Sequence, residues 1–485
     1  MMLLAMGLYV AVVLAISVWA TRRTRSARDF FVAGGGLGVV TMGIASMAAT
    51  LSGFAFIGGP GLIYSVGLGA VFIVLPASLT NTMSAWVLGK RLRLLAEVRE
   101  ILTIPDALAA RFDSRAVQGM AGVAILAAVI GYTATNVLAL GLVLEAVLGL
   151  TRTPALWLGA LLMLAYSVSG GILAGVYNDV FQGTLMAVAS VLIFVLAVKV
   201  GGGVSQITQT LAAHDARLVS PWGTLSPMAA LSFFFVFGIG TLGQPHVVHK
   251  FLMLRDPLKL RWYPLVMTVA MTTTLLLFVI VGLVMKALVV SGQTPALARP
   301  DDATPTFLRL FTPAPVAGLV FAAVAAAIMS TVNSFLSVGA AACTRDVPRA
   351  LGLPVRDELR TGRWWTVVLM LGATLLAQVS TTLVAFLGVF GFGLFASTLT
   401  PALALGLNWH GATRTGALAS IGVGLVLTLG LEALAFFGGC RLPAGVTPAA
   451  LALALSLATF VVVSWVTRAE ARAELADDIR AVLDA

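Results

Sequence analysis

Thirteen apolar segments follow one another along this chain with no globular insert between them. Each is about 20 residues or more, enough to cross a hydrocarbon core of about 30 Å. Apolar residues make up 59% of the sequence and charged residues 10%, well below the roughly 25% charged residues of soluble domains. The sequence therefore predicts an all-α integral membrane protein. The predicted segments are 3–20, 39–65, 68–89, 117–149, 153–171, 173–200, 227–247, 263–290, 314–343, 364–384, 385–408, 415–437 and 446–467.

The positive charge predicts how the chain is oriented, because cytoplasmic loops of membrane proteins carry the excess of Lys and Arg. If the amino terminus lies outside, the cytoplasmic segments hold 23 of the 30 Lys and Arg residues. We therefore expect a multi-pass protein of the plasma or inner membrane with a cytoplasmic carboxyl terminus. The net charge of +10 then reflects topology and indicates no nucleic-acid partner. The cytoplasmic segments are 21–38, 90–116, 248–262, 344–363, 409–414 and 468–485.

Glycine and proline interrupt the second and seventh segments, and each opens a set of five. Freed carbonyls at membrane depth must be buried in protein or line a wet cavity. Because five is odd, the second set of helices enters the membrane in the opposite sense to the first. This predicts an inverted repeat, formed by 39–200 and 227–408, with a binding site at the two broken helices. A simple proline kink is the alternative. The interrupting residues are Gly53, Gly58, Gly59 and Pro60, then Gly238, Gly240, Gly243 and Pro245.

Polar residues inside two segments are candidates for ion binding. Ala327, Ser330 and Thr331 stand at i, i+3 and i+4, so they share one side of a helix. Hydroxyl oxygens there, with carbonyls freed at a broken helix, suit a hard cation such as sodium. Plain packing between helices is the alternative. Asp179 lies inside the sixth segment, where an ionisable group usually marks an ion or proton path. It also suits a role in tying helices together.

Several function classes lack their sequence signatures. The four histidines form no HExxH and join no cysteine pair, which argues against a transition-metal site. No Walker A sequence occurs, which argues against a nucleotide-driven pump. No nucleophile and base pair lies in the segments, so we do not expect an enzyme.

Five motifs in order identify a family resemblance. They are DFFVAGGGLG at 29–38, ATLSGFAFIGGPG at 49–61, SGGILAGVYNDVFQG at 169–183, GQPHVVHKF at 243–251 and AAIMSTVNSFLSVGAAACTRD at 326–346. With these motifs the chain resembles the sodium/solute symporters, which include proline, pantothenate, monocarboxylate, sialic acid and sugar carriers. GQPH is typical of the branch with proline and monocarboxylate carriers.

The resemblance implies thirteen helices in the leucine-transporter fold, with broken helices 2 and 7, and alternating access driven by sodium. The implied coupling ion is Na⁺, with no organic cofactor. Its ligands would be the carbonyls of Ala48, Leu51 and Ala327 and the hydroxyls of Ser330 and Thr331.

Some members hold a second sodium, which here would involve Asp179, Asn333 and Ser334 beside Ser330. Asn333 departs from the hydroxyl that those members have. A proton-coupled carrier of the same fold, with Asp179 as the titrating group, is an alternative, and a transporter-like solute sensor is another.

For the solute, the resemblance points to the two broken helices and the fourth segment. Phe237 and Thr241 align with a larger tryptophan and tyrosine of the proline carriers, which argues against assuming proline. A half-helix amino end can hold a carboxylate, so a small amino acid or monocarboxylate is expected. The implied substrate residues are Ser52, Tyr132, Phe237, Thr241, Gln244 and Pro245, although Tyr132 and Phe237 also suit core or lipid-facing positions.

The whole chain, 1–485, is expected to form one membrane transport domain whose partners are a small solute and the lipid bilayer. The first helix and a cytoplasmic loop cover 1–38, and the two repeats cover 39–200 and 227–408. Two extra helices cover 409–467, and 468–485 form a cytoplasmic tail.

Overall fold

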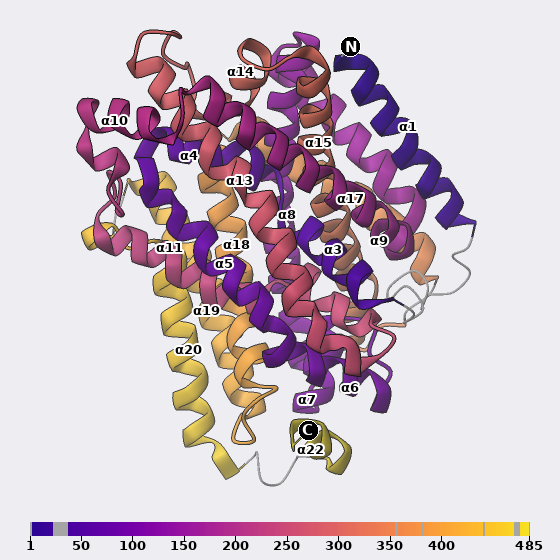
Figure 1. The fold of residues 1–485 in the computed structure, drawn as a ribbon. Coiled ribbons are helices and arrows are strands. Elements are labelled where there is room, and N and C mark those ends of the chain that lie inside the picture. The colour runs from indigo at the N-terminus through magenta and orange to yellow at the C-terminus, as the bar shows by residue number, and fades with distance from the viewer. Residues whose placement is uncertain are drawn as a thin grey trace.

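The structure, a computed structural model, describes residues 2–22, 37–354, 357–380, 382–439, 442–469 and 476–484. Within these residues the regular elements are helices, and the strand-like pairing is one isolated bridge between Leu37 and Leu254. Long helices pack side by side as a bundle, with short helices at its upper and lower ends (Figure 1). The prediction of an all-α protein is confirmed. Most of the DFFVAGGGLG motif lies outside the described residues.

Eight helices of the described chain are long and apolar enough to cross a membrane, or nine if a bent pair counts as one span. The protein is therefore a multi-pass membrane protein. The first half contains α1 (Met2–Thr21), α3 (Val39–Thr50), η2 (Phe54–Gly58), α4 (Gly59–Val66), η3 (Gly67–Ala70), α5 (Val71–Ser84), η4 (Ala85–Gly89), α6 (Lys90–Val98), α7 (Ile104–Phe112), α8 (Arg115–Leu148), α9 (Arg152–Val200), α10 (Val204–His214) and η5 (Ala216–Val219).

The second half continues with further long helices joined by short ones. Its elements are α11 (Pro227–Ile239), η6 (Gly240–Gly243), α12 (Pro245–Val248), η7 (His249–Met253), η8 (Pro257–Trp262), α13 (Tyr263–Val290), η9 (Pro300–Asp302), α14 (Ala303–Leu310), α15 (Ala314–Ala341), η10 (Ala342–Asp346), α16 (Val347–Ala350), α17 (Glu358–Val379), α18 (Val384–Thr400), η11 (Pro401–Leu405), α19 (Arg414–Gly438), η12 (Pro443–Gly445), α20 (Pro448–Val466) and α22 (Asp477–Asp484).

One predicted helix boundary is not seen as a gap between two helical elements. Segments 153–171 and 173–200 belong to a single helical element of 49 residues, α9. Gly170 and Gly171 lower helix propensity without ending the helix, since each glycine costs only about 1 kcal/mol relative to alanine. The side chains of 169–174 lie outside the described residues.

The interior of the bundle is organised around α15, which packs against α9, α8, α1 and α3. Small residues cover most of its surface, and nearly every one of them is buried. Helices in lipid approach closely through such residues. The polar positions of α15 are therefore held against other helices rather than against lipid.

The chain leaves helical geometry at Leu51, one residue after α3 ends (φ −88°, ψ 108°). Helical structure resumes at Phe54, whose N–H donates to Ser52 Oγ at 3.2 Å. The Gly53 N–H donates to Asn136 Oδ1 at 2.9 Å. A β-carbon on Gly53 would lie 2.5 Å from Ala139 Cβ, so the close approach of α8 requires glycine.

A second departure occurs at Gln244 (φ −85°, ψ 97°), between η6 and α12. The residue before a proline is pushed towards extended backbone, and Pro245 follows here. The helices on the two sides of this point are bent by 44°.

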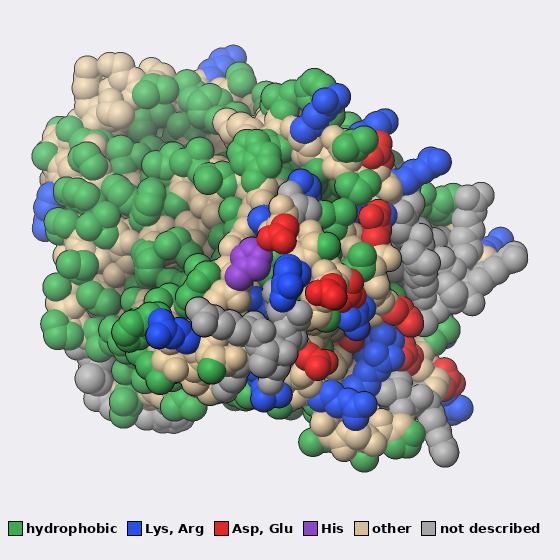
Figure 2. Space-filling view, turned by 90° about the horizontal axis from the view of Figure 1, so that it is seen from below, with side chains coloured by type: hydrophobic (Ala, Val, Ile, Leu, Met, Phe, Trp, Pro, Cys, Tyr) green, Lys and Arg blue, Asp and Glu red, His purple; other side chains and the backbone are tan. Residues whose placement is uncertain are grey.

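Charged side chains gather over part of the lower face of the molecule, and hydrophobic side chains cover much of the rest (Figure 2). The described tail helix α22 lies at this end, beside α6 (Figure 1). Arg99 donates to both carboxylate oxygens of Asp478, at 2.5 and 2.9 Å.

Candidate functional site

Five oxygen atoms named from the sequence lie together where α15 crosses the end of α3. Ser330 Oγ donates to the carbonyl of Ala48 at 2.8 Å and lies 3.0 Å from that of Ala327. Thr331 Oγ1 lies 3.3 Å from the carbonyl of Leu51. We call these three carbonyls and two hydroxyls the carbonyl–hydroxyl cluster.

The local fold explains why these carbonyls are available. Ala48 and Leu51 lie in the last turn of α3 and just beyond it, where carbonyls have lost their partners four residues on. The hydroxyls of α15 now satisfy them, and Ala48, Ser330 and Thr331 are fully buried. Oxygen ligands without a carboxylate suit a monovalent hard cation.

The sequence missed one carbonyl of this site. Thr331 Oγ1 is nearer to the carbonyl of Ala49, at 3.1 Å, than to that of Leu51. Helix geometry could have suggested Ala49, because it is also in the last turn of α3.

Aromatic rings surround two of the predicted substrate residues, Phe237 and Tyr132. The ring centroids of Phe237 and Phe54 are 5.6 Å apart, and those of Phe237 and Phe392 are 4.3 Å apart. The Tyr132 and Phe335 rings are tilted against each other with centroids 4.7 Å apart, and the Tyr132 hydroxyl lies 3.5 Å from Ser52 Oγ. We call these five rings the aromatic cluster.

Thr241, Gln244 and Pro245 are buried beside this cluster. Thr241 Oγ1 lies 2.9 Å from the carbonyl of Gly238, so its own helix uses the hydroxyl. Gln244 Nε2 donates to the carbonyls of Gly240 and Phe392, at 3.1 and 3.2 Å. The Gln244 amide oxygen has no hydrogen-bond partner in the described part of the chain, so it is the free polar atom of this group.

Sequence reasoning missed Phe392 and Asn136, which both hold this site together. Asn136 is one helical turn from Tyr132 and donates to its carbonyl at 3.0 Å, so a lone amide in an apolar segment was an available signal. Phe392 comes from α18, and nothing in its local sequence distinguishes it from a lipid-facing ring.

Asp179 forms a buried ion pair with Lys250 Nζ at 2.6 Å. Asn333 and Ser334 line the same small cavity as Asp179. The structure thus brings together the three residues considered for a second sodium or proton, and adds a lysine that the sequence reasoning had counted only as a loop charge.

A segment near the upper end of the molecule covers the first interruption. Asp301 Oδ2 accepts from the Val384 N–H at 2.8 Å, and Thr304 Oγ1 donates to the carbonyl of Phe56, also at 2.8 Å. Burial raises the pKa of Asp301 to about 6. A β-carbon on Gly61 would lie 2.7 Å from Asp301 Oδ1, so this contact is close.

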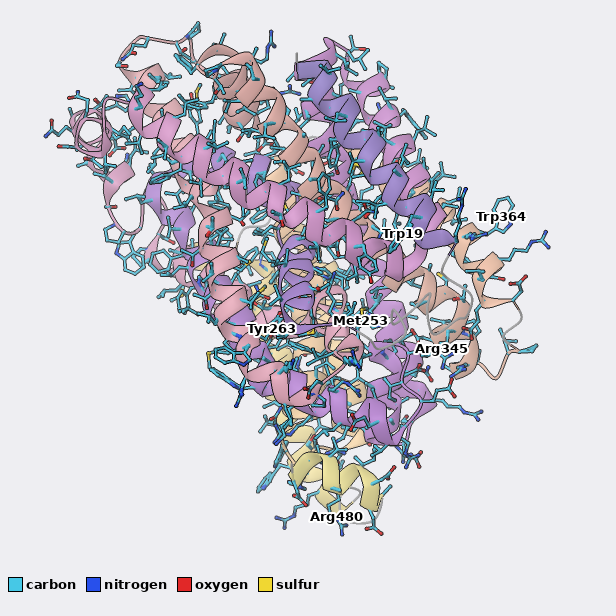
Figure 3. All side chains as sticks on the ribbon, turned by 45° about the vertical axis from the view of Figure 1, so that its right-hand side comes forward. Trp19, Met253, Tyr263, Arg345, Trp364 and Arg480 are labelled. Atoms are coloured by element: carbon cyan, nitrogen blue, oxygen red, sulfur yellow. The ribbon has the colours of Figure 1, made fainter. Side chains whose placement is uncertain are left out.

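A cluster of acids and arginines joins α7 to the end of α15 in the lower half of the molecule, where Figure 3 labels Arg345. Arg345 Nε donates to Asp106 Oδ2 at 2.9 Å, and Arg345 Nη1 donates to Glu358 at 3.2 Å. Thr103 donates to Asp346 at 2.7 Å. These contacts fix α7 against η10, opposite the segment that carries Asp301.

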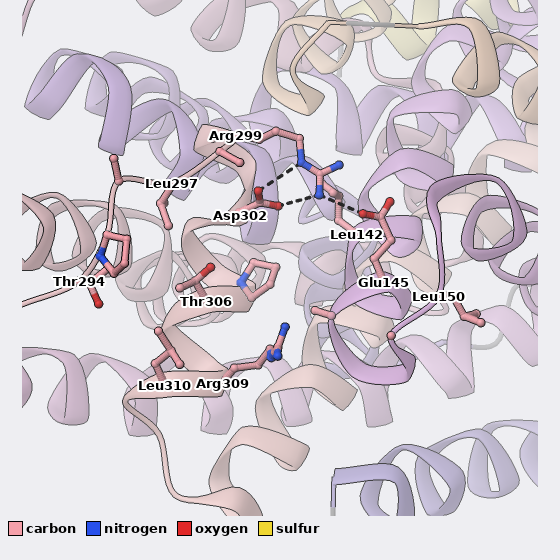
Figure 4. A pocket seen from close by; sticks show the side chains of 16 residues that line it. Leu142, Glu145, Leu150, Thr294, Leu297, Arg299, Asp302, Thr306, Arg309 and Leu310 are labelled. Carbon is pink, nitrogen blue, oxygen red and sulfur yellow. Dashed lines mark hydrogen bonds and ion pairs between the residues drawn. The ribbon is translucent and has the colours of Figure 1, made fainter.

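A cavity of about 500 Å³ opens beside the end of α8 (Figure 4). Arg299 binds Glu145 at 2.9 Å and Asp302 at 3.0 Å on one wall, and Arg309 lies on another. Two carboxylates therefore already neutralise Arg299. None of the predicted sodium or substrate residues lines this cavity.

Comparisons with known proteins place the chain among sodium-coupled transporters by sequence similarity. The model of the sodium:solute symporter family matches residues 30–424. The chain is 30% identical over 473 residues to the sodium/pantothenate symporter of Escherichia coli K12, with 94% of each chain covered. It is 26% identical over 477 residues to the osmoregulated proline transporter of Bacillus subtilis 168, with 97% of this chain and 96% of the relative covered.

The fold is shared with solved transporters. A Na⁺-coupled sialic acid symporter in a substrate-bound, outward-open state superposes with a TM-score of 0.79 at 21% identity, covering 96% of this chain and 97% of the other. A nucleobase-cation-symport-1 family transporter gives a TM-score of 0.59 at 14% identity, covering 95% and 99%. These are transporters of the leucine-transporter fold rather than enzymes. From its motifs, its fold and these matches, the chain belongs to the sodium:solute symporter family.

Proposed function

We propose that this protein is a secondary active transporter that couples the inward movement of Na⁺ to that of a small carboxylate-bearing solute. The observation that carries the proposal is the carbonyl–hydroxyl cluster. Sodium prefers several oxygen ligands, and the two hydroxyls of α15 already lie within 3.3 Å of carbonyls at the end of α3. Family membership supports the same coupling ion.

In this proposal Na⁺ binds the carbonyls of Ala48, Leu51 and Ala327 and the hydroxyls of Ser330 and Thr331. The ion would replace the hydroxyl protons as partner of the carbonyls, and so hold α15 against the end of α3. Because Ser52 and Phe54 follow α3 directly, this clamp would also position one wall of the solute site. Coupling is then reciprocal: the solute tightens sodium binding by the same factor.

The solute would bind at the aromatic cluster, next to Ser52, Thr241, Gln244 and Pro245. The rings offer an apolar surface of limited size, and the free amide oxygen of Gln244 and the hydroxyls of Ser52 and Tyr132 offer hydrogen bonds. Pantothenate, proline and sialic acid, which name the relatives and neighbour above, all carry a carboxylate. A carboxylate-bearing solute, such as a small amino acid or monocarboxylate, therefore suits the proposal better than an uncharged sugar.

We further propose a single transport domain of thirteen spans, in which the two ends of α9 supply two, because its 49 residues are about twice the length that one span needs. Two inverted repeats, 39–200 and 227–408, would each open with a broken helix, at Leu51 and at Gln244. The amino terminus would lie on the outer side of the cell membrane, and residues 468–485 would lie in the cytoplasm. Asp301 would then face outward and Arg345 inward. Alternating access would open these two ends in turn.

Uptake in proteoliposomes tests the proposal. Labelled proline, pyruvate, acetate, pantothenate and alanine are offered with an inward sodium gradient, with potassium in place of sodium, and to a Ser330→Ala/Thr331→Ala variant. We expect uptake of one of these solutes that needs sodium and is lost in the variant. Uptake indifferent to sodium and to the variant would contradict the proposal. If that uptake followed a proton gradient and vanished in Asp179→Asn, it would assign coupling to Asp179 instead.

A further inference from the structure

A lysine and an aspartate form an ion pair inside the membrane-spanning bundle. Lys250 Nζ lies 2.6 Å from Asp179 Oδ2, and the two side chains are 4% and 1% exposed. Asp179 comes from α9, and Lys250 comes from η7, directly after the bend at Gln244. The pair therefore links one repeat to the start of the other.

Several oxygen-bearing side chains that could bind a cation lie around this pair. A cavity of about 20 Å³ touches Asp179, Lys250, Asn333 and Ser334, which is room for about one water molecule. Met253, which closes η7 and also lines the cavity, lies in the interior of the lower half of the molecule (Figure 3). The second carboxylate oxygen of Asp179 has no hydrogen-bond partner in the described chain. One acceptor thus remains, next to an amide and a hydroxyl of α15.

The charge of this site is already balanced. A carboxylate inside a membrane protein needs a cation close by, and the ammonium of Lys250 supplies it. A sodium ion beside Asp179 would lie within a few ångströms of that ammonium and would be repelled in a medium that screens poorly. The site can hold a second cation only if Lys250 moves away.

Resting on the proposed function, we propose that the ammonium of Lys250 permanently takes the place of a second sodium ion, so that the protein binds and couples one sodium ion per solute. Lys250 is then the residue that determines the stoichiometry. It is tethered to the backbone, so it balances Asp179 in every state without crossing the membrane. The sodium at the carbonyl–hydroxyl cluster would be the ion that is transported.

Equilibrium binding of ²²Na⁺ to the purified full-length protein, in choline buffer, counts the sites directly. We expect one sodium per wild-type protein, with a Hill coefficient of one. Lys250→Met frees Asp179 and should give two sites. Lys250→Arg keeps the charge and should give one, as should Lys250→Met/Asp179→Asn, which removes both partners.

Two wild-type sites would overturn the inference, and so would one site in a folded Lys250→Met variant. If Lys250→Met does not fold, the number of sodium ions bound by Asp179→Asn, which keeps the lysine, tests the inference. We expect Asp179→Asn to bind one sodium ion, as the wild type does. Loss of that sodium ion in Asp179→Asn would contradict the inference. Failure of the proposed function looks different: the wild type would then bind no sodium, or Ser330→Ala would leave sodium affinity unchanged.

Discussion

Ser330 Oγ lies 2.8 Å from the carbonyl oxygen of Ala48, 282 positions away in the chain. This hydrogen bond joins the middle of α15 to the last turn of α3, one turn before the chain leaves helical geometry. It places a donor where a helix end has an unpaired acceptor. Replacing this proton by a cation would keep both oxygens satisfied, which is why the contact suits an ion that enters and leaves.

Ser330→Ala should weaken sodium binding about 10-fold, because it removes one oxygen ligand worth about 1–2 kcal/mol. The measurement is the sodium concentration that gives half-maximal uptake at a fixed solute concentration. Thr331→Ala should have a similar effect, because its hydroxyl contacts the carbonyls of Ala49 and Leu51.

Thr374→Ala is the matched control for both variants. Its hydroxyl is also buried, but it donates to the carbonyl of Met370 in its own helix, at 2.7 Å. The sodium dependence of this variant should equal that of the wild type. An equal loss of sodium affinity in Thr374→Ala would mean that the effect comes from general loosening of the bundle.

Gly391→Ala should destabilise the protein by about 1–3 kcal/mol, because the added carbon overpacks a close helix crossing. It would lie 2.8 Å from the backbone N and Cα of Tyr132, and backbone cannot move aside as a side chain can. Thermal unfolding in detergent measures the loss. Gly372→Ala is the control: no atom lies within 4 Å of its added carbon, so it should gain up to about 1 kcal/mol from helix propensity.

The features that the sequence predicted well are those with a local signal. Apolar length indicated long membrane-crossing helices, Pro245 indicated the bend at Gln244, and spacing placed Ser330 and Thr331 on one side of α15. Each depends on a few neighbouring residues, so a single chain reveals it.

The features that the sequence missed depend on how distant helices pack. Phe392 meets Phe237 only because α18 crosses α11, and Lys250 meets Asp179 only because η7 turns inward after the bend. A lone buried carboxylate does require a countercharge, yet the basic residues nearest to Asp179 in the sequence are Arg152 and Lys199, and neither is its partner. The continuity of α9 was missed because of a local signal that misleads: its glycine pair is typical of a helix end.

Arg345→Met should be strongly destabilising, by about 3–5 kcal/mol, because it removes the buried cation that pairs with Asp106 and Glu358. The Arg345 side chain is 3% exposed and binds both acids. Arg349→Met is the comparison, because it removes an exposed partner of the same carboxylate. The Arg349 side chain is 42% exposed and lies 3.7 Å from Asp106, so its loss should lower the free energy of unfolding by less than about 1 kcal/mol. Thermal unfolding of the two variants gives the comparison, and equal effects would contradict the importance of burial.

The packing of the segment around Asp301 should depend on pH. Burial raises the pKa of this carboxyl from 3.8 to about 6, so the packed segment prefers the protonated form. A shift of about 2 units corresponds to about 3 kcal/mol. This contribution is fully present below about pH 4 and is lost as the pH rises through about 6. Arg299 and Asp302 are the charged groups nearest to Asp301 in sequence, and they bind each other at 3.0 Å.

Hydrogen exchange of the Val384 amide reports this packing, because its N–H donates to Asp301. After correction for the intrinsic rate, exchange should be slower at pH 5 than at pH 7.5. Asp301→Asn cannot titrate, so it should remove the difference, whereas Asp302→Asn should retain it. If Asp301→Asn kept the wild-type pH dependence, another group would control the segment. Since the segment also holds the carbonyl of Phe56 through Thr304, a change in its packing reaches the helix that follows the proposed sodium site.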